Sequence, residues 1–154
     1  MTKISACIDR HGGCVDKYIG DEVMALFGAP VAKEDSALQA VHAALEIVAV
    51  LKAWNQERGA AGQPSVEMGI GIHTGTMLVG NMGAENRLNY TVIGSNVNLA
   101  ARICSAAKGM QILISGDTLQ EHGVKEAFSI EEMSPITLKG FSLPIALYQI
   151  SMGH

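Results

Sequence analysis

The sequence predicts an α+β fold of the ferredoxin-like kind, an antiparallel sheet with helices packed on one face. Three observations predict it. Short apolar runs alternate with glycine-containing turns, as in strands joined by hairpins. One long stretch, 36–58, instead repeats its apolar residues at helical spacing. A length of 154 residues with 48% hydrophobic and 17% charged content suits one globular domain, which we place at 1–151, before a tail at 152–154.

Two helices are predicted in the first third of the chain. Residues 1–11 have apolar residues at helical spacing and end at a pair of glycines. Because this helix starts at residue 1 without a cap, we expect a preceding segment in the natural protein. Residues 36–58 form a longer helix that begins at Asp35 or Ser36 and covers the core.

A hairpin is predicted between these helices, at 14–28. Its two apolar runs flank Gly20-Asp21, and glycine accepts a positive φ without steric cost. The turn would hold the Asp21 carboxylate at the hairpin tip, four residues after the Lys17 ammonium. These two groups suit a hard divalent cation and an anionic ligand, but a solvated surface turn has the same pattern.

The middle of the chain predicts a second pair of strands. Residues 66–73 alternate large apolar residues with small or polar ones, and we expect 77–83 to be their antiparallel partner. Gly69 and Gly71 lie inside the first of these strands. They therefore do not form a dinucleotide-binding loop, and they indicate close packing against another backbone.

Residues 89–103 predict a strand that runs into a helix through Gly94. Asn98 and Arg102 lie four residues apart and share one helix face, where an amide and a fixed cation can hold a sugar oxygen and a phosphate. They can equally be ordinary surface residues. We expect the apolar side of this helix to be formed by three residues, Val97, Ala100 and Ala101.

The C-terminal third predicts further short strands. A strand at 111–114 precedes a short helix capped near Ser115, and strands at 128–130 and 136–138 flank an acidic turn at Glu131-Glu132. The last strand is at 144–150. Lys139 stands beside a glycine-containing turn, where its ammonium could reach a phosphate or simply be solvated.

Composition excludes several functions. A net charge of −4 argues against non-specific nucleic-acid binding, which needs a basic face. We expect no membrane-spanning segment, since no apolar run is judged long enough, and no signal peptide. The three cysteines show no metal-binding or disulfide spacing, which is typical of a reduced, cytoplasmic protein.

Three motifs occur together in this chain: Lys-x-Ile-Gly-Asp at 17–21, Tyr-Thr-Val-Ile-Gly-x-x-Val-Asn-x-Ala-Ala-Arg at 90–102, and Leu-Lys-Gly at 138–140. In this order they closely resemble the catalytic domain of class III nucleotidyl cyclases, and within it the bacterial-type adenylate cyclases. The resemblance covers 1–151, and the 90–102 motif is its most specific part.

The resemblance implies a role for each candidate residue. Asp21 matches a metal-binding aspartate, and Lys139 a triphosphate-binding lysine. Asn98 matches the asparagine that orients the ribose, and Arg102 the arginine that stabilises charge on the transferring phosphate. Lys17 and Thr91 match the two groups that read adenine, where guanylate cyclases typically have Glu and Cys. Adenylate cyclases have Asp at the position of Thr91, or in one subclass Thr. That subclass includes cyclases that respond to bicarbonate.

The implied reaction converts ATP to 3′,5′-cyclic AMP and pyrophosphate with two Mg²⁺ or Mn²⁺ ions. The resemblance places the site between two antiparallel copies of the domain. Asp21 comes from one copy, and Lys17, Thr91, Asn98 and Arg102 come from the other. An upstream sensor or regulatory domain is also implied.

One departure from the family pattern concerns the first strand. The family carries its other metal-binding aspartate there, in a Phe-x-Asp-Ile-x-Gly-Phe-type motif that this sequence lacks. We therefore expect an N-terminally incomplete domain with little or no turnover and an exposed sheet edge. The alternatives are a non-catalytic cyclase-like module that dimerises or binds nucleotide, a guanylate cyclase, or a diguanylate cyclase, whose Gly-Gly-Asp/Glu-Glu-Phe turn the hairpin partly matches.

Overall fold

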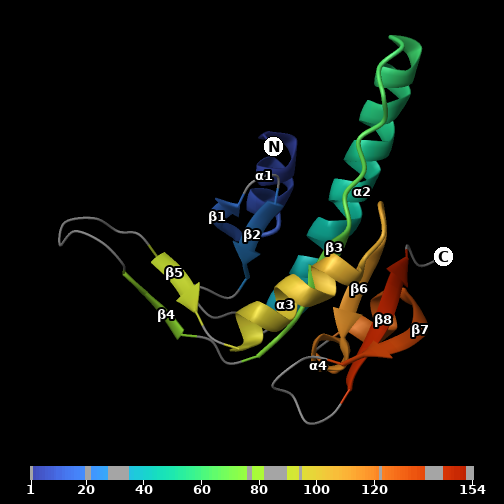
Figure 1. Cartoon of the computed structure of the whole chain (residues 1–154). Helices are drawn as coiled ribbons and strands as arrows, with labels where there is room; N and C mark the ends of the chain where they lie inside the picture. Colours follow the sequence, from blue (N-terminus) through green and yellow to red (C-terminus); the bar gives the residue numbers. More distant parts are fainter. Residues whose placement is uncertain are drawn as a thin grey trace.

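The computed structural model describes residues 2–19, 22–27, 35–75, 78–81, 90–93, 95–121, 123–137 and 144–151. It has mixed helix and strand content, so the predicted α+β class is confirmed (Figure 1). The elements in chain order are α1 (Thr2–Arg10), β1 (Cys14–Ile19), β2 (Glu22–Leu26), α2 (Ser36–Ala60), β3 (Ile70–Ile72), β4 (Leu78–Asn81), β5 (Tyr90–Ile93), α3 (Ser95–Ala106), β6 (Ile112–Ser115), α4 (Gly116–Leu119), α5 (Val124–Ala127), β7 (Ser129–Ile136) and β8 (Ile145–Ser151).

The largest sheet in the described part of the chain has four strands in the order β3-β6-β8-β7. β6 pairs antiparallel with β8, and β8 antiparallel with β7, but β3 and β6 run parallel. The expectation of an all-antiparallel sheet was therefore wrong in this detail. Parallel neighbours need a long crossover, and the chain between β3 and β6 supplies one that contains α3.

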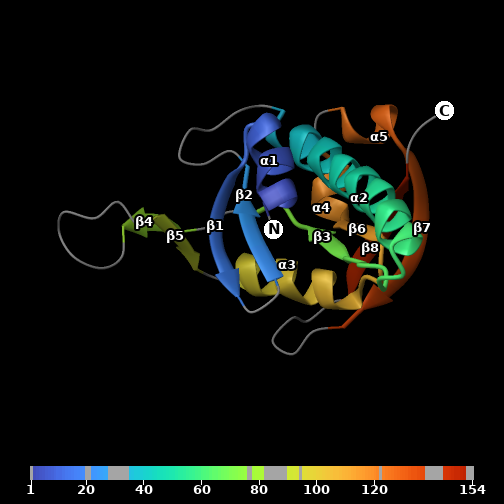
Figure 2. The ribbon, with the colours of Figure 1, turned by 90° about the horizontal axis from the view of Figure 1, so that it is seen from above.

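Helices cover both faces of this sheet, which corrects the expectation that they pack on one face. Ile112 and Ile114 of β6 pack with α2, whereas Leu113 between them packs with α3. Successive strand residues point to opposite faces, so β6 must be covered on both sides. Figure 2 shows α2 and α3 on opposite sides of β3, β6 and β8.

Two predicted strand arrangements were also wrong. β4, at 78–81, pairs antiparallel with β5 and not with the strand before it, which joins β6. Glu131-Glu132 form no turn, since both lie within the continuous strand β7, opposite Gln149 and Tyr148. Both glutamates are exposed, so their charged side chains stay in water although they lie within a strand.

The two glycines at the start of β3 bring α3 close to the sheet, as the sequence indicated. A Cβ on Gly69 would lie 2.7 Å from the carbonyl oxygen of Ala107, and one on Gly71 would lie 2.7 Å from the Cα of Cys104. Ile70 and Ile72, between and after them, pack on the α2 side. Glycine is required here because the α3 backbone occupies the space of a side chain.

α1 and the β1–β2 hairpin form a second unit of the core. The predicted helix and hairpin are both present, with β1 and β2 paired antiparallel from Cys14↔Leu26 to Ile19↔Glu22. Cys7 and Ile8 of α1 are buried against Ile47 and Leu51 of α2. Val15, Val23, Ala25 and Phe27 of the hairpin segment pack on the same cluster, so α2 connects the hairpin to the main sheet.

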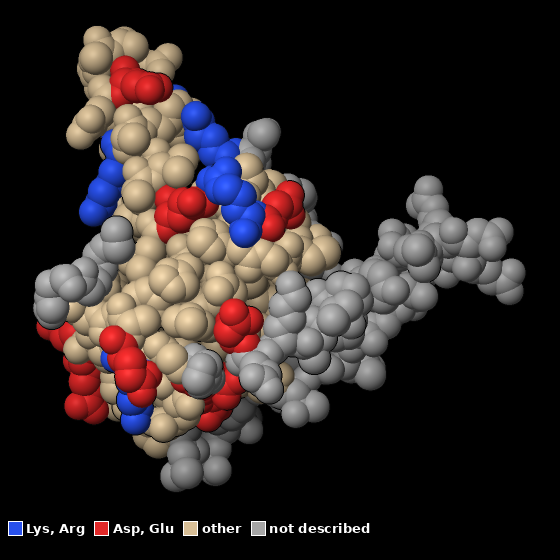
Figure 3. All heavy atoms as spheres, turned by 180° about the vertical axis from the view of Figure 1, so that it is seen from behind, with Lys and Arg blue, Asp and Glu red and all other residues tan. Residues whose placement is uncertain are grey.

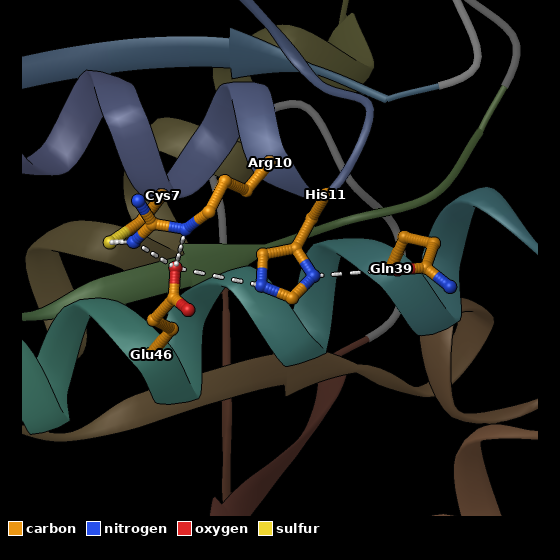
Figure 4. Close-up of polar contacts among 5 residues, drawn as sticks. All are labelled: Cys7, Arg10, His11, Gln39 and Glu46. Atoms are coloured by element: carbon orange, nitrogen blue, oxygen red, sulfur yellow. Dashed lines mark hydrogen bonds and ion pairs between the residues drawn. The ribbon is translucent and has the colours of Figure 1, made fainter.

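Polar contacts join α1 to α2 at the edge of this cluster (Figure 4). The Arg10 guanidinium donates to the Glu46 carboxylate at 2.6 and 3.0 Å, and His11 lies between Glu46 at 3.7 Å and Gln39 at 3.4 Å. The hydrogen bonds from Arg10 hold the pKa of Glu46 below its ordinary value. Burial, reinforced by Glu46, raises the pKa of the Cys7 thiol to about 11.

α2 corrects the expectation that no segment has the length of a membrane span. It has 25 residues and a mean hydropathy of 1.4 in its most apolar window, which is enough by length and composition. Eight of its residues are nevertheless buried, of which four belong to the cluster with the main sheet and two to the cluster with α1. A core helix shared by two clusters shows this same composition.

Charge is interspersed on the face seen from behind. Figure 3 shows basic and acidic side chains next to one another on its upper part, and mainly acidic ones on its lower part.

Candidate active site

α3 presents Asn98 and Arg102 on its exposed side. Both residues are exposed and lie one turn apart, as their spacing predicted. The helix is held from the other side by Leu99 and Ile103, which are 3% and 0% exposed and pack on β6 and β8. The expectation that Ala101 forms the apolar side was wrong, since it is exposed.

The Arg102 guanidinium is available for an anion. Within the described ranges it makes no ion pair, whereas Arg10 is occupied by Glu46. Arginine stays charged at any physiological pH and offers a planar fork of donors that matches phosphate oxygens. Asn98, one turn earlier, adds a neutral amide that can donate to and accept from a sugar hydroxyl.

Lys17 and Thr91 are carried by β1 and β5. β5 leads into α3, and β1 lies against β5. Thr91 pairs with Gly80 of β4, and Lys17 pairs with Met24 of β2, directly after a register shift in β1. The structure therefore gathers the segments of four predicted site residues, although it describes the side chains of Asn98 and Arg102 only.

Asp21 and Lys139 lie outside the described residues. The antiparallel strand pairing of β1 with β2, whose last residue pair is Ile19↔Glu22, confirms the hairpin in which Asp21 was predicted. Among the described residues, no three His, Cys, Asp or Glu side chains gather in a way that would hold a metal ion. The Asp21 carboxylate alone does not hold two metal ions, so a complete metal site needs further ligands.

An open cleft of about 390 Å³ lies elsewhere, between the end of α1 and the start of α2. It is lined by Asp9, Arg10, His11, Gly12, Phe27, Asp35, Ser36 and Gln39. Neither Asn98 nor Arg102, the two predicted site residues whose side chains are described, lines it, so we do not assign the candidate chemistry to this cleft.

The sequence reasoning did not find a group of hydrogen-bonded side chains at the end of β3. His73 contacts Ser115 at 2.7 Å, and Thr74 contacts Thr118 at 2.9 Å. The available signal was two polar residues directly after a half-buried strand, together with the serine that ends β6 and caps α4.

A family model described as "Adenylate and Guanylate cyclase catalytic domain" matches residues 1–152 of the chain. This chain belongs to that family. Similar curated proteins include an adenylate cyclase of Anabaena cylindrica, 37% identical over 93% of the chain, and adenylate cyclase 1 of Rhizobium meliloti, 34% identical over 95% of it. The chain spans only 29% and 22% of the length of these two relatives.

Solved structures of this family share the fold. The adenylyl cyclase CyaB from P. aeruginosa is 35% identical, with a TM-score of 0.88 over 99% of this chain and 79% of that one. The guanylyl cyclase Cya2 is 37% identical, with a TM-score of 0.84 over 99% of this chain and 77% of that one. Membership of the class III cyclase family is thereby confirmed. Overall sequence similarity does not distinguish an adenylate cyclase from a guanylate cyclase.

Proposed function

We propose that this chain is the catalytic domain of an adenylate cyclase, which converts ATP to 3′,5′-cyclic AMP and pyrophosphate. One observation carries the proposal. α3 exposes, one turn apart and directly after β5, an asparagine and an arginine that makes no ion pair with any residue the structure describes, and β1 with Lys17 lies against β5. The family membership supports it, and curated adenylate cyclases match more than nine-tenths of the chain.

The reaction is an internal displacement at phosphorus. The ribose 3′-oxygen attacks the α-phosphorus, its bond to phosphorus forms, and the bond from the α-phosphorus to the bridging oxygen breaks. Pyrophosphate leaves with that electron pair, and the 3′-hydroxyl proton passes to solvent. Asn98 would orient the ribose, while Arg102 would neutralise the charge that grows on the α-phosphate oxygens.

The base and the triphosphate need further contacts. Lys17 and Thr91 would read the adenine ring from adjacent strands, which favours ATP over GTP. Lys139 would bind the triphosphate. These three roles follow from the motif positions, and the approach of β1 to β5 supports the first two.

Cyclases of this family work with a divalent metal ion. We propose Mg²⁺ or Mn²⁺, held in part by Asp21, which when bound would lower the charge repulsion between the attacking oxygen and the phosphates. Because the sequence contains no Phe-x-Asp-Ile motif, the second carboxylate must come from another segment. We expect weak turnover from these 154 residues alone.

A pair of copies would complete the site. Cyclase domains of this family work on nucleotides as dimers. We propose that Asp21 of one copy faces Lys17, Thr91, Asn98 and Arg102 of the other, which would give two equivalent sites in a symmetric dimer.

A guanylate cyclase is the second candidate, because Cya2 is as similar in sequence as the adenylate cyclases. The experiment compares cyclic nucleotide formation from ATP and GTP with Mn²⁺. It uses this chain and a longer chain that contains a Phe-x-Asp-Ile motif. We expect the longer chain to prefer ATP clearly. Equal rates would overturn the adenine assignment of Lys17 and Thr91, and no product from either nucleotide would overturn the cyclase proposal.

A further inference from the structure

The chain leaves the main sheet at the end of β3. Backbone pairing of β3 with β6 ends at Ile72↔Ile114. The next residue on each strand continues the contact through side chains, because His73 Nδ1 lies 2.7 Å from Ser115 Oγ. The contact between β3 and β6 is thus extended by one residue pair, which is held by two side chains instead of backbone hydrogen bonds.

Thr74 makes the next connection. Its hydroxyl lies 2.9 Å from that of Thr118, which in turn lies 3.3 Å from Ser115 Oγ and donates a long hydrogen bond of 3.5 Å to the Ile72 carbonyl. Ser115 also caps α4 by accepting from the Thr118 backbone N–H. Thr118 and Ser115 are only 0% and 1% exposed, so water cannot replace these partners.

These contacts stand at the base of the β4–β5 ribbon. Figures 1 and 2 both show the ribbon extending away from the main sheet. A two-stranded ribbon is marginally stable by itself, and its direction depends on how its ends are held. One end continues into α3, which packs on the sheet, and the other begins after Thr74.

We propose that His73 and Thr74 are positioning residues. Through Ser115 and Thr118 they fix the direction in which β4 and β5 leave the sheet, and thereby the position of Thr91 opposite the nucleotide base. The base-reading part of this inference rests on the proposed cyclase function. The anchoring part does not.

Removal of one hydroxyl tests the anchor with little change in shape. Thr74→Val keeps the volume of the side chain but leaves the buried Thr118 hydroxyl without this partner. We expect amide protection in β4 and β5 to fall about tenfold, while protection in β6 and β8 changes less. Thr74→Ser, which keeps the hydroxyl, should restore protection of the ribbon.

Val48→Ala is the control, because it weakens the α2 side of the core without touching the anchor. Hydrogen exchange by mass spectrometry is measured on all three variants, and the ATP-over-GTP rate ratio is measured on the same substitutions in the longer chain. The expected result is a selective loss of ribbon protection and a lower ratio in Thr74→Val alone. A ribbon that is unprotected in the wild type, or equally affected by Val48→Ala, would overturn the anchor.

The two proposals fail in different ways. Hydrogen exchange does not depend on turnover, so a wild type that forms no cyclic nucleotide contradicts the cyclase function and leaves the exchange result valid. A selective loss of protection with an unchanged ATP-over-GTP ratio would overturn the positioning of Thr91 by this anchor.

Discussion

Arg102 is a residue whose function can be separated from folding. It lies on the exposed side of α3, while Leu99 and Ile103 hold the helix from the buried side. Arg102→Ala should therefore leave the unfolding midpoint unchanged and lower the rate of cyclic AMP formation about 100-fold, the usual cost of losing a transition-state donor. Rates measured on the variants of the longer chain, and thermal unfolding of the purified variants, give the two effects.

Lys108→Ala is the matched control for Arg102, since it removes an exposed cation just beyond the end of α3. It should have the wild-type rate. Arg102→Lys should recover only part of the activity, because it keeps the charge but loses the planar fork. An unchanged rate in Arg102→Ala would remove the role that we propose for this residue.

Glu46 gives a prediction about stability and pH. Because the pKa of Glu46 is lowered in the folded chain, its ionised carboxylate stabilises the folded state. This stabilisation is complete above the ordinary pKa of 4.5 and is lost as the pH falls through the lowered pKa. Between pH 7 and 3, the melting temperature of Glu46→Gln should fall less steeply than that of the wild type. Glu57→Gln, an exposed change on the same helix, should follow the wild-type curve, and parallel curves for all three would contradict the prediction.

For individual residues, the sequence predicted those placements that depend only on spacing along the chain. Asn98 and Arg102 share a helix face because they are four apart, and the structure exposes both. The contact of Thr74 with Thr118 joins residues 44 apart, and no local pattern specifies such a contact. The roles of all six candidate residues remain predictions, including those of Asn98 and Arg102, for which the structure gives the placement on α3 and no more.

The packing of α3 on β3 depends on two glycines. Gly71 faces the α3 backbone, so Gly71→Ala must push the helix away. We expect a loss of about 1–3 kcal/mol in the free energy of unfolding, together with lower activity, because Asn98 and Arg102 move with the helix. Urea unfolding measures the first effect and the cyclase assay the second.

Gly59 provides the control for this element. It lies near the end of α2, and a Cβ there would meet nothing within 4 Å. Gly59→Ala should be neutral or should stabilise by up to about 1 kcal/mol, since alanine favours helix. Equal midpoints for the Gly71→Ala variant and the wild type would show that α3 does not need this close approach.

Elements were easier to predict than their partners. The helices α1 and α2 and the strand followed by a helix predicted at 89–103 follow from local periodicity and agree with the structure, which has β5 and α3 there. β4 was paired with the wrong strand, because register between distant segments depends on the crossover through α3 and leaves no local signal. The pair Glu131-Glu132 was read as a turn, although it contains none of the residues that form turns readily.

The whole molecule is organised around α2 and the mixed sheet. α2 packs on the sheet with one part of its surface and on α1 with another, so it links the hairpin of Lys17 to the sheet that holds α3. The single-face arrangement was predicted because antiparallel hairpins combined with helices are typical of a ferredoxin-like fold. β6 is instead buried along its whole length, which requires helices on both faces.

The most direct test of the central claim is complementation between two inactive variants. Asp21→Ala and Arg102→Ala are made in the longer chain and mixed in equal amounts with ATP and Mn²⁺. In mixed dimers one of the two sites keeps both residues, so the mixture should reach about a quarter of the wild-type rate, while each variant alone is nearly inactive. A mixture that is no more active than its components would contradict a site shared between two copies.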